Sequence, residues 1–305
     1  MTDLQKSFSA NFSAKECTFY TDEPLMNHCA FRIGGASEIL AVPKTEKVLS
    51  EILKYAKERS IPLHILGNGS NVLIADEGLS GITVKLMGGL CDLLYLGDGI
   101  IVSGAGVSLT RLCNFAKEHS LTGLEFAYGI PGSVGGAVYM NAGAYDGEIK
   151  DVLYSVRSMN KEGSDITETP AKDIEISYRN TPFMKNDRII TSAFFKLKEG
   201  NAEEITAKME ELMGKRKNSQ PLEFPSAGST FKRPATGYAA ALIDLSGLKG
   251  TAVGGAEVST KHAGFVINKG GATFKDVTAL MEIIKTTVYE KHGIELQPEV
   301  EILKD

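Results

Sequence analysis

The stretch from residue 129 to residue 147, GIPGSVGGAVYMNAGAYDG, constrains the fold more than any other part of the chain. It holds six glycines and no Lys or Arg, and its first acidic residue is Asp146. Because glycine has no Cβ, such a backbone can adopt positive φ and approach a ligand closely. Unshielded main-chain N–H groups can then form a nest for an anion. The stretch therefore predicts a loop that binds an anionic, flat cofactor. The alternative is a set of tight turns inside a packed α+β domain.

A second glycine-rich loop, Gly67-Asn68-Gly69-Ser70-Asn71, follows a predicted strand over residues 61–66. It lacks the Gly-Lys-Ser/Thr of a Walker motif, and a strand follows it where a dinucleotide-binding GxGxxG motif would open a helix. Gly104-Ala105-Gly106 is a weaker partial match, which we interpret as a turn before a helix over residues 109–118. Two such loops favour a cofactor held by backbone donors outside the common nucleotide-binding folds.

The overall composition excludes some classes of partner. The chain has 305 residues, a length that suits about two domains. Its formal net charge of −5 argues against nucleic acid as the main partner, because a phosphate-binding surface normally carries a basic excess. The four cysteines form no CxxC pair, and the histidines show no metal-binding pattern. No apolar run resembles a signal peptide or a membrane span. We therefore expect a reduced, cytoplasmic protein with no metal site.

Hydrophobic periodicity predicts an α+β fold. A strand over residues 38–42, a helix over 45–59 capped by Thr45 and the strand over 61–66 form a β-α-β unit, which favours parallel pairing. Residues 1–30 are polar and aromatic, with a turn at Glu23-Pro24-Leu25. The remaining predicted strands are 83–86, 93–96, 100–103, 152–159, 189–197 and 298–303, and the remaining helices are 109–118, 201–217, 238–245 and 273–292.

Several motifs, taken in order, resemble those of the UDP-N-acetylenolpyruvoylglucosamine reductases, the flavin enzymes that make UDP-N-acetylmuramate for peptidoglycan. The resemblance runs from about Asn27 to Leu303 and covers nearly the whole chain. The motifs are HCAFRIGG at 28–35, GNGSNVL at 67–73, the glycine-rich stretch 129–144, Tyr178-Arg179, AGSTF at 227–231 and Pro298-Glu299-Val300. The chain looks like the shorter class of this family, in which a tyrosine-bearing loop is missing.

The resemblance implies a FAD-binding fold of the vanillyl-alcohol-oxidase (PCMH) type, built from two subdomains, plus a C-terminal α+β domain that binds substrate. We expect residues 1–86 and the strand 296–305 in the first subdomain, 87–199 in the second, and 200–295 in the substrate domain. By resemblance the FAD pyrophosphate is held by Gly67, Asn68, Gly69, Ser70, Asn71, Gly129, Ile130, Pro131, Gly132, Ser133, Gly135, Gly136 and Ala137, with Asn141, Gly143 and Ala144 continuing along the cofactor. The first loop offers only Asn and Ser where some relatives in the wider fold attach flavin through His or Cys. We therefore predict non-covalent FAD.

The family's chemistry implies roles for three further residues. NADPH reduces the flavin and leaves, and flavin N5 then delivers hydride to C3 of the enolpyruvyl group, so that negative charge develops at C2 and on the carboxylate. Arg179, on a turn before Pro182, would stabilise this charge with the help of Glu299, and Ser229 would donate a proton to C2. From the residues alone, an arginine such as Arg179 is more often a surface ion-pair partner and a serine such as Ser229 is usually a turn or cap residue. Glu301 is a rival to Glu299 on the same strand face.

The substrate implied by the resemblance, UDP-N-acetylglucosamine enolpyruvate, carries a diphosphate, so cationic groups are expected in the third domain. The candidates are Arg216, Lys217, Lys232, Arg233 and Lys261, led by Arg233 and Lys261 because each adjoins a glycine-bearing motif. We expect a monomer, with no nucleic-acid or membrane partner. Two alternatives stay open: an oxidase or dehydrogenase of the same FAD fold that acts on an alcohol or 2-hydroxy acid, and a non-catalytic nucleotide-binding module.

Overall fold

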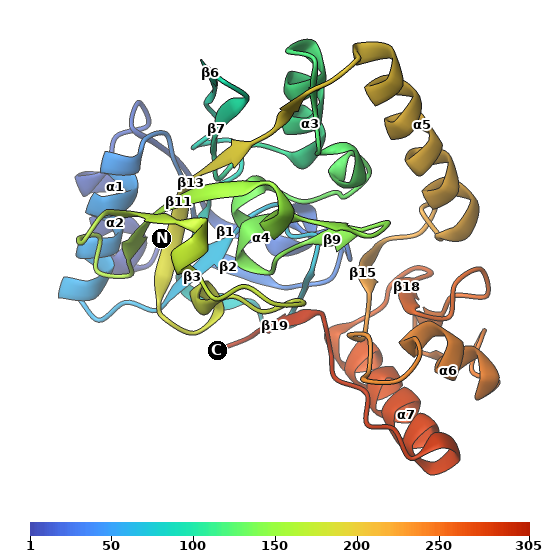
Figure 1. The fold of residues 1–305 in the computed structure, drawn as a ribbon. Helices are drawn as coiled ribbons and strands as arrows, with labels where there is room; N and C mark the ends of the chain where they lie inside the picture. The colour runs from blue at the N-terminus through green and yellow to red at the C-terminus, as the bar shows by residue number, and fades with distance from the viewer. The chain divides into compact units, whose positions relative to one another are not determined.

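The computed structural model describes residues 1–305 as a mixture of helices and small sheets (Figure 1). The α-helices are α1 (Asp3–Asn11), α2 (Glu46–Glu58), α3 (Leu109–Glu118), α4 (Val134–Tyr139), α5 (Ala202–Ser219), α6 (Ala239–Leu245) and α7 (Phe274–His292). The longer strands are β1 (Cys17–Pro24), β2 (Ala36–Pro43), β3 (Leu63–Leu66), β5 (Leu79–Lys85), β6 (Leu93–Gly97), β7 (Ile100–Gly104), β11 (Leu153–Asn160), β12 (Thr167–Pro170), β13 (Arg188–Lys196), β15 (Ser226–Ser229) and β18 (Phe265–Asn268). The short strands are β4 (Val72–Ile74), β8 (Leu121–Thr122), β9 (Gly143–Ala144), β10 (Gly147–Glu148), β14 (Lys198–Glu199), β16 (Ala252–Val253), β17 (Ala256–Val258) and β19 (Glu301–Leu303).

The chain forms two structural units, and each is built from segments that are not continuous in the sequence. Unit 1 comprises Met1–Thr21, Glu38–Asn68 and Gly81–Lys215. Unit 2 comprises Asp22–Ser37, Gly69–Ser80 and Arg216–Asp305. The first glycine-rich loop therefore contributes its first two residues to unit 1 and its last three to unit 2.

Unit 1 contains a four-stranded sheet in the order β1-β2-β5-β3 and a five-stranded antiparallel sheet in the order β12-β11-β13-β7-β6. Strand β3 pairs in parallel with β5, with Leu63 opposite Ile82, and β5 lies between β2 and β3. The predicted β-α-β unit is therefore present, but its two strands are not neighbours. Helix α2 begins after Thr45, whose side chain accepts a hydrogen bond from the Val48 amide, as the sequence predicts.

The core of unit 1 collects the apolar faces of α2 and α3 and residues from both sheets. Leu49 and Ile52 of α2 are fully buried, as is Leu112 of α3. Arg157 of β11 pairs with Glu46 at the start of α2 at 2.9 Å, and Thr191 of β13 donates to the same carboxylate at 2.6 Å. This contact ties the first turn of α2 to the five-stranded sheet.

Helix α1 was not predicted from the sequence. The Thr2 side chain accepts from the Gln5 amide and the Thr2 amide donates to the Gln5 side-chain oxygen, so that the two residues form a capping box. Phe8 on this helix is completely buried among aromatic rings, with the centroid of Phe12 at 4.6 Å and that of Phe19 at 5.3 Å. The capping-box spacing was the signal that could have revealed this helix.

Unit 2 contains an antiparallel sheet in the order β15-β18-β17-β16, with α7 packed on β16 and β17. Helix α7 begins at a capping box of Thr273 and Asp276 and ends at Gly293, which adopts the left-handed conformation with φ of 66°. The C-terminal strand β19 pairs in parallel with β4, which immediately follows the first glycine-rich loop. The last residues of the chain thus complete the same unit as residues 69–80.

Candidate active site

Gly67 and Asn68, in unit 1, contact the start of the glycine-rich stretch. A Cβ atom at Gly67 would lie 2.4 Å from the Ser133 hydroxyl, so a larger residue there would have to displace that side chain. Asn68 donates from its side chain to the carbonyl of Pro131 at 2.5 Å. The sequence placed both loops at one cofactor, and these two contacts bring residues of both loops together within unit 1.

The rest of the first loop, in unit 2, is held by the HCAFRIGG motif. The Ala30 amide donates to the Gly69 carbonyl at 2.9 Å. Gly69 has φ of +66°, and a Cβ there would lie 2.2 Å from the His28 carbonyl oxygen. Glycine is therefore required at position 69 both by conformation and by space.

The donors of this loop fit the anion that the sequence predicts. The protein uses the Gly69 carbonyl and the Asn68 side chain to hold the loop, whereas the amides of Asn68, Gly69 and Ser70 donate to no protein group. Consecutive N–H groups around a left-handed residue form an anion-binding nest. The loop thus has the donor set that a pyrophosphate such as that of FAD requires.

The glycine-rich stretch is not the continuous loop that the sequence predicts. Residues 134–139 form the short helix α4, and the Ser133 side chain accepts from the Gly136 amide at 3.3 Å. None of the six glycines from 129 to 147 has positive φ, whereas Asn141, Tyr145 and Asp146 do. Gly135 instead permits close packing, because a Cβ there would lie 2.9 Å from that of Ala105. The predicted positive-φ role of these glycines is therefore wrong, and close approach of backbones explains Gly135.

Arg179 lies on a tight turn in which Ser177 and Asn180 exchange both main-chain hydrogen bonds. Its backbone is left-handed, with φ of +50°. The two terminal nitrogens of its guanidinium donate to the carbonyls of Asn141 and Gly143, each at 3.0 Å. Both acceptors are main-chain carbonyls, and the two contacts together orient the guanidinium. Unit 1 thus brings Arg179 to the Asn141–Ala144 segment that the sequence assigned to the cofactor.

Ser229 and Glu299 lie on neighbouring segments of unit 2. The Glu299 amide donates to the Thr230 carbonyl at 2.8 Å, and Phe231 and Pro298 form an isolated antiparallel bridge. The Asn71 side chain donates to the Glu299 carbonyl at 2.9 Å. Ser229 is exposed at the end of β15, and Glu299 is half-buried. Unit 2 therefore joins three predicted motifs: the end of the first loop, AGSTF and Pro-Glu-Val.

Thr230 was not predicted from the sequence as a site residue, but its hydrogen bonds connect the segments of this junction. It is 3% exposed, and its amide donates to the Gly264 carbonyl at 2.8 Å. Its hydroxyl accepts from the Val266 amide at 3.0 Å. Its position inside the AGSTF motif, between Ser229 and Phe231, was the sequence signal that could have revealed it.

The cationic candidates for the diphosphate occupy different settings in unit 2. The Arg233 guanidinium lies 4.2 Å from the centroid of the exposed Tyr238 ring. Lys261 donates to the Lys217 carbonyl at 2.8 Å and lies 3.8 Å from a Glu223 carboxylate oxygen. Arg233 and Lys261 are both exposed, which suits contact with a polar ligand.

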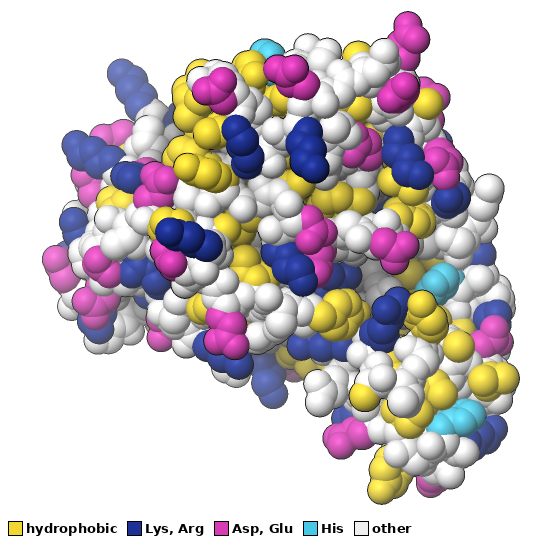
Figure 2. All heavy atoms as spheres, viewed as in Figure 1, with side chains coloured by type: hydrophobic (Ala, Val, Ile, Leu, Met, Phe, Trp, Pro, Cys, Tyr) yellow, Lys and Arg dark blue, Asp and Glu magenta, His cyan; other side chains and the backbone are white.

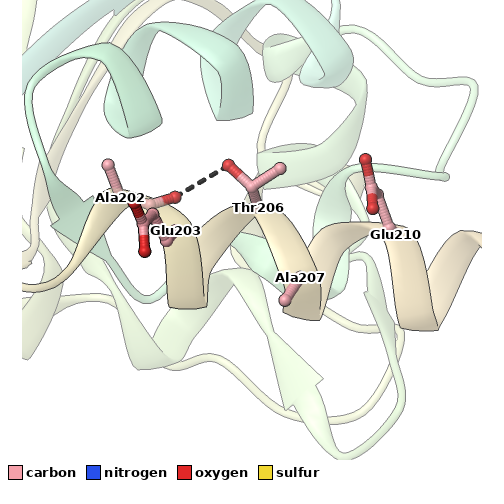
Figure 3. A pocket seen from close by; sticks show the side chains of 5 residues that line it. All are labelled: Ala202, Glu203, Thr206, Ala207 and Glu210. Atoms are coloured by element: carbon pink, nitrogen blue, oxygen red, sulfur yellow. Dashed lines mark hydrogen bonds between the residues drawn. The ribbon is translucent and has the colours of Figure 1, made fainter.

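A shallow pocket on α5 is unsuited to the predicted ligands. Figure 3 shows its lining side chains, with the Thr206 hydroxyl donating back to the Ala202 carbonyl at 2.7 Å. The lining contains the carboxylates of Glu203 and Glu210 and no cation. Its charge would repel a pyrophosphate or a nucleotide sugar.

The surface carries charges of both signs. Figure 2 shows basic and acidic side chains interspersed over the visible face. Several exposed side chains form ion pairs, such as Lys208 and Lys215 with Glu211. No group of three or more His, Cys, Asp or Glu side chains is arranged to hold a metal ion. None of the helices is both long and apolar enough to cross a bilayer.

Comparison with known proteins places the chain among its relatives. Residues 220–303 match the C-terminal domain of UDP-N-acetylenolpyruvoylglucosamine reductase, and residues 37–167 match a FAD binding domain. A UDP-N-acetylenolpyruvoylglucosamine reductase from Caldanaerobacter subterraneus subsp. tengcongensis is 47% identical over 289 residues, which cover 95% of each chain. The chain belongs to the UDP-N-acetylenolpyruvoylglucosamine reductase family. A second member of this family, from Clostridioides difficile, is 46% identical and covers 92% of each chain.

Solved structures agree with this family. The crystal structure of UDP-N-acetylenolpyruvylglucosamine reductase from Thermus caldophilus has a TM-score of 0.79 and 34% identity, covering 94% of this chain and 99% of that one. Alkyldihydroxyacetonephosphate synthase, at a TM-score of 0.50 and 14% identity over 65% of this chain, shares the fold alone. The predicted α+β fold, with a FAD-binding part and the C-terminal domain of the reductase family, is confirmed. The predicted cofactors, FAD and NADPH as reductant, are confirmed as well.

Proposed function

We propose that this protein reduces UDP-N-acetylglucosamine enolpyruvate to UDP-N-acetylmuramate with NADPH as the reductant, in the synthesis of peptidoglycan precursors. The observation that carries the proposal is the junction in unit 2, where Asn71, Thr230 and Glu299 are hydrogen-bonded in series and Ser229 adjoins them. The match of residues 220–303 to the reductase C-terminal domain supports this reaction over an oxidase or dehydrogenase of the same fold.

FAD, when bound, supplies the hydride that adds to C3 of the enolpyruvyl group. The first loop and the α4 stretch would hold its pyrophosphate, with the amides of Asn68, Gly69 and Ser70 as donors. The flavin is non-covalent in this proposal.

Arg179 and Glu299 act on the charge that develops at C2 and on the carboxylate. A guanidinium stays protonated at every relevant pH and can fork onto a carboxylate. Because the neutral carbonyls of Asn141 and Gly143 orient Arg179, its position is set before substrate arrives. Glu299 assists Arg179 in stabilising the enol form.

Ser229 donates the proton to C2. An unassisted hydroxyl is a weak acid, so its contribution depends on geometry. Its neighbour Thr230 is buried and hydrogen-bonded through main chain and side chain, which fixes the end of β15. Ser229 is therefore an exposed hydroxyl on a rigid support.

Arg233 and Lys261 bind the diphosphate of the substrate in this proposal, because both are exposed cations in the substrate domain. We further propose a cytoplasmic monomer. Four free thiols fit a reducing compartment, and light scattering at micromolar concentration tests the monomer: a mass near twice 32.8 kDa would contradict it.

Anaerobic stopped-flow absorbance tests the reaction. NADPH should bleach the flavin, and UDP-N-acetylglucosamine enolpyruvate should restore its colour. Failure to reoxidise with this substrate would overturn the proposal, and reoxidation by a simple alcohol's carbonyl product would favour the oxidase reading.

Replacing Ser229 by Ala separates the two half-reactions. We expect flavin reduction by NADPH to stay within about twofold of the parent rate, whereas reoxidation slows by about 10²-fold or more, as for loss of a general acid. Equal slowing of both steps would show that Ser229 is not the proton donor.

A further inference from the structure

Asn141 has a side chain that is entirely committed to the protein. The residue is 0% exposed, although the sequence assigned it to the cofactor. Its side-chain nitrogen donates to Glu148 Oε2 at 2.6 Å and to the Ser177 carbonyl at 3.1 Å. Its side-chain oxygen accepts from the Lys150 amide at 3.0 Å. Both amide hydrogens are thus used and the side-chain oxygen already accepts one hydrogen bond, in a residue with no exposed surface to offer a ligand.

The backbone of Asn141 holds Arg179 as well. Its left-handed conformation, with φ of +48°, is one that Asn tolerates better than most residues. Its carbonyl accepts from one terminal nitrogen of Arg179 at 3.0 Å, and the Gly143 carbonyl accepts from the other at 3.0 Å. Gly143 is itself fixed by pairing with Glu148 in the β9–β10 hairpin.

Asn141 therefore binds the Arg179 turn through two contacts. Its side chain binds the Ser177 carbonyl at the base of the turn, and its main chain binds the guanidinium at the tip. Thr181, on the far side of the turn, adds a hydrogen bond to the Tyr139 carbonyl at 2.5 Å. A charged side chain that must meet a developing charge needs this kind of fixed orientation, because a shift of about 1 Å can cost about 10²-fold in rate.

We propose that Asn141 is a positioning residue for Arg179 and makes no side-chain contact with the cofactor. This inference rests on the proposed role of Arg179 in substrate reduction. The contact with Glu148 also explains why residue 141 is neutral, because a carboxylate at 141 would face the Glu148 carboxylate at 2.6 Å. Asn141→Asp keeps the shape and reverses this interaction, whereas Asn141→Gly keeps the left-handed backbone and its carbonyl but removes all three side-chain bonds.

The experiment measures the two half-reactions and FAD content of the holoenzyme for Asn141→Gly, Asn141→Asp and Arg179→Ala. Asp146→Gly is the matched control, because Asp146 is left-handed with φ of 66°, lies in the same stretch and is exposed. We expect both Asn141 variants to retain FAD and to be reduced by NADPH within about twofold of the parent rate, but to reoxidise with substrate about 10- to 10²-fold more slowly. Added to Arg179→Ala, Asn141→Gly should slow reoxidation by less than about twofold more, since the residue it positions is gone.

The outcomes separate this inference from the proposed function. If Arg179→Ala reoxidises at the parent rate, the proposed role of Arg179 fails. If Arg179→Ala is slow and both Asn141 variants reoxidise like Asp146→Gly, the positioning role is overturned. Loss of FAD or of NADPH reduction in step with reoxidation would overturn it too, because it would place Asn141 at the cofactor. If one variant does not fold, the other decides.

Discussion

Thr230 forms three hydrogen bonds in unit 2, although no reaction step is assigned to it. Its amide, carbonyl and hydroxyl each bond a different segment of unit 2, ending at Gly264, Glu299 and Val266. The segments that carry Ser229 and Glu299 are therefore held side by side by Thr230, to which we assign no contact with the substrate. A sequence motif therefore contains supporting residues such as Thr230 beside the residues proposed to react, and it does not distinguish their roles.

Replacing Thr230 by Val tests this support. The change keeps the shape of the side chain and leaves the buried Val266 amide without its acceptor, which should cost about 1–3 kcal/mol of unfolding free energy. Urea unfolding measures the loss, and Thr230→Ser, which retains the hydroxyl, is the control. Equal stability of the Val and Ser variants would contradict the argument.

His262 predicts a pH dependence of stability. Burial, aided by the Lys249 charge, lowers the pKa of His262 below its ordinary value of 6.5, and its Nδ1 accepts from the Gly264 amide at 3.2 Å. Between the two pKa values the unfolded chain binds a proton at this histidine and the folded chain does not. The stability that depends on His262 is therefore complete above pH 6.5 and is lost as the pH falls from 6.5 through the folded-state pKa. Urea midpoints at pH 7.5 and 5.5 should differ by less in His262→Gln than in the parent. An NMR titration of His262 with a midpoint at or above 6.5 would refute the shift.

At the scale of elements, a helix cap involves only a few neighbouring residues, so single substitutions can test its contribution to stability. Thr273 caps α7 by accepting from the Asp276 amide at 3.1 Å, so Thr273→Ala should cost about 1 kcal/mol of stability. Thr273→Ser should be close to the parent, because serine caps equally well. Thermal or urea unfolding followed by circular dichroism compares the three proteins, and a Ser variant as unstable as the Ala variant would rule out the hydroxyl as the cause.

The same local chemistry explains which elements could be predicted from the sequence. Helices α2, α3 and α7 have caps and apolar faces within a few residues, and their predicted bounds agree with the structure within about two residues. Helix α4 could not be predicted because its glycines have poor helix propensity and its first amides donate to the distant carbonyls of Val107 and Ala105. The strand order β1-β2-β5-β3 could not be predicted because pairing depends on distant segments.

The candidate site also has features that could be predicted from the sequence and features that could not. Its motifs could be recognised one by one, since each is a short run of residues. The positioning role of Asn141 could not, because its bonds join it to Ser177 and Arg179, 36 and 38 residues away. An asparagine in a glycine-rich stretch looks like a ligand residue until its partners are known.

At the scale of the whole molecule, the cofactor should stabilise the fold. A non-covalent ligand that binds only the folded chain adds about 2.7 kcal/mol when its free concentration is about 100 times its dissociation constant. The melting temperature should therefore rise with added FAD after the flavin has been stripped. Acid precipitation should leave the protein colourless with FAD in the supernatant, and yellow colour retained on the precipitated chain would disprove non-covalent binding.

The parallel pairing of β19 with β4 has a consequence for synthesis on the ribosome. Asn71 of the first loop bonds Glu299, which the ribosome adds 228 residues later. At ~5–20 residues per second, about 10 to 45 s separate the two events. By the end of that interval all of unit 1 has been synthesised, but the strand that follows the first loop still has no partner. Strand β4 therefore stays unpaired until residues 301–303 have emerged from the ribosome, so the segment after the first loop is among the last parts of unit 2 to fold.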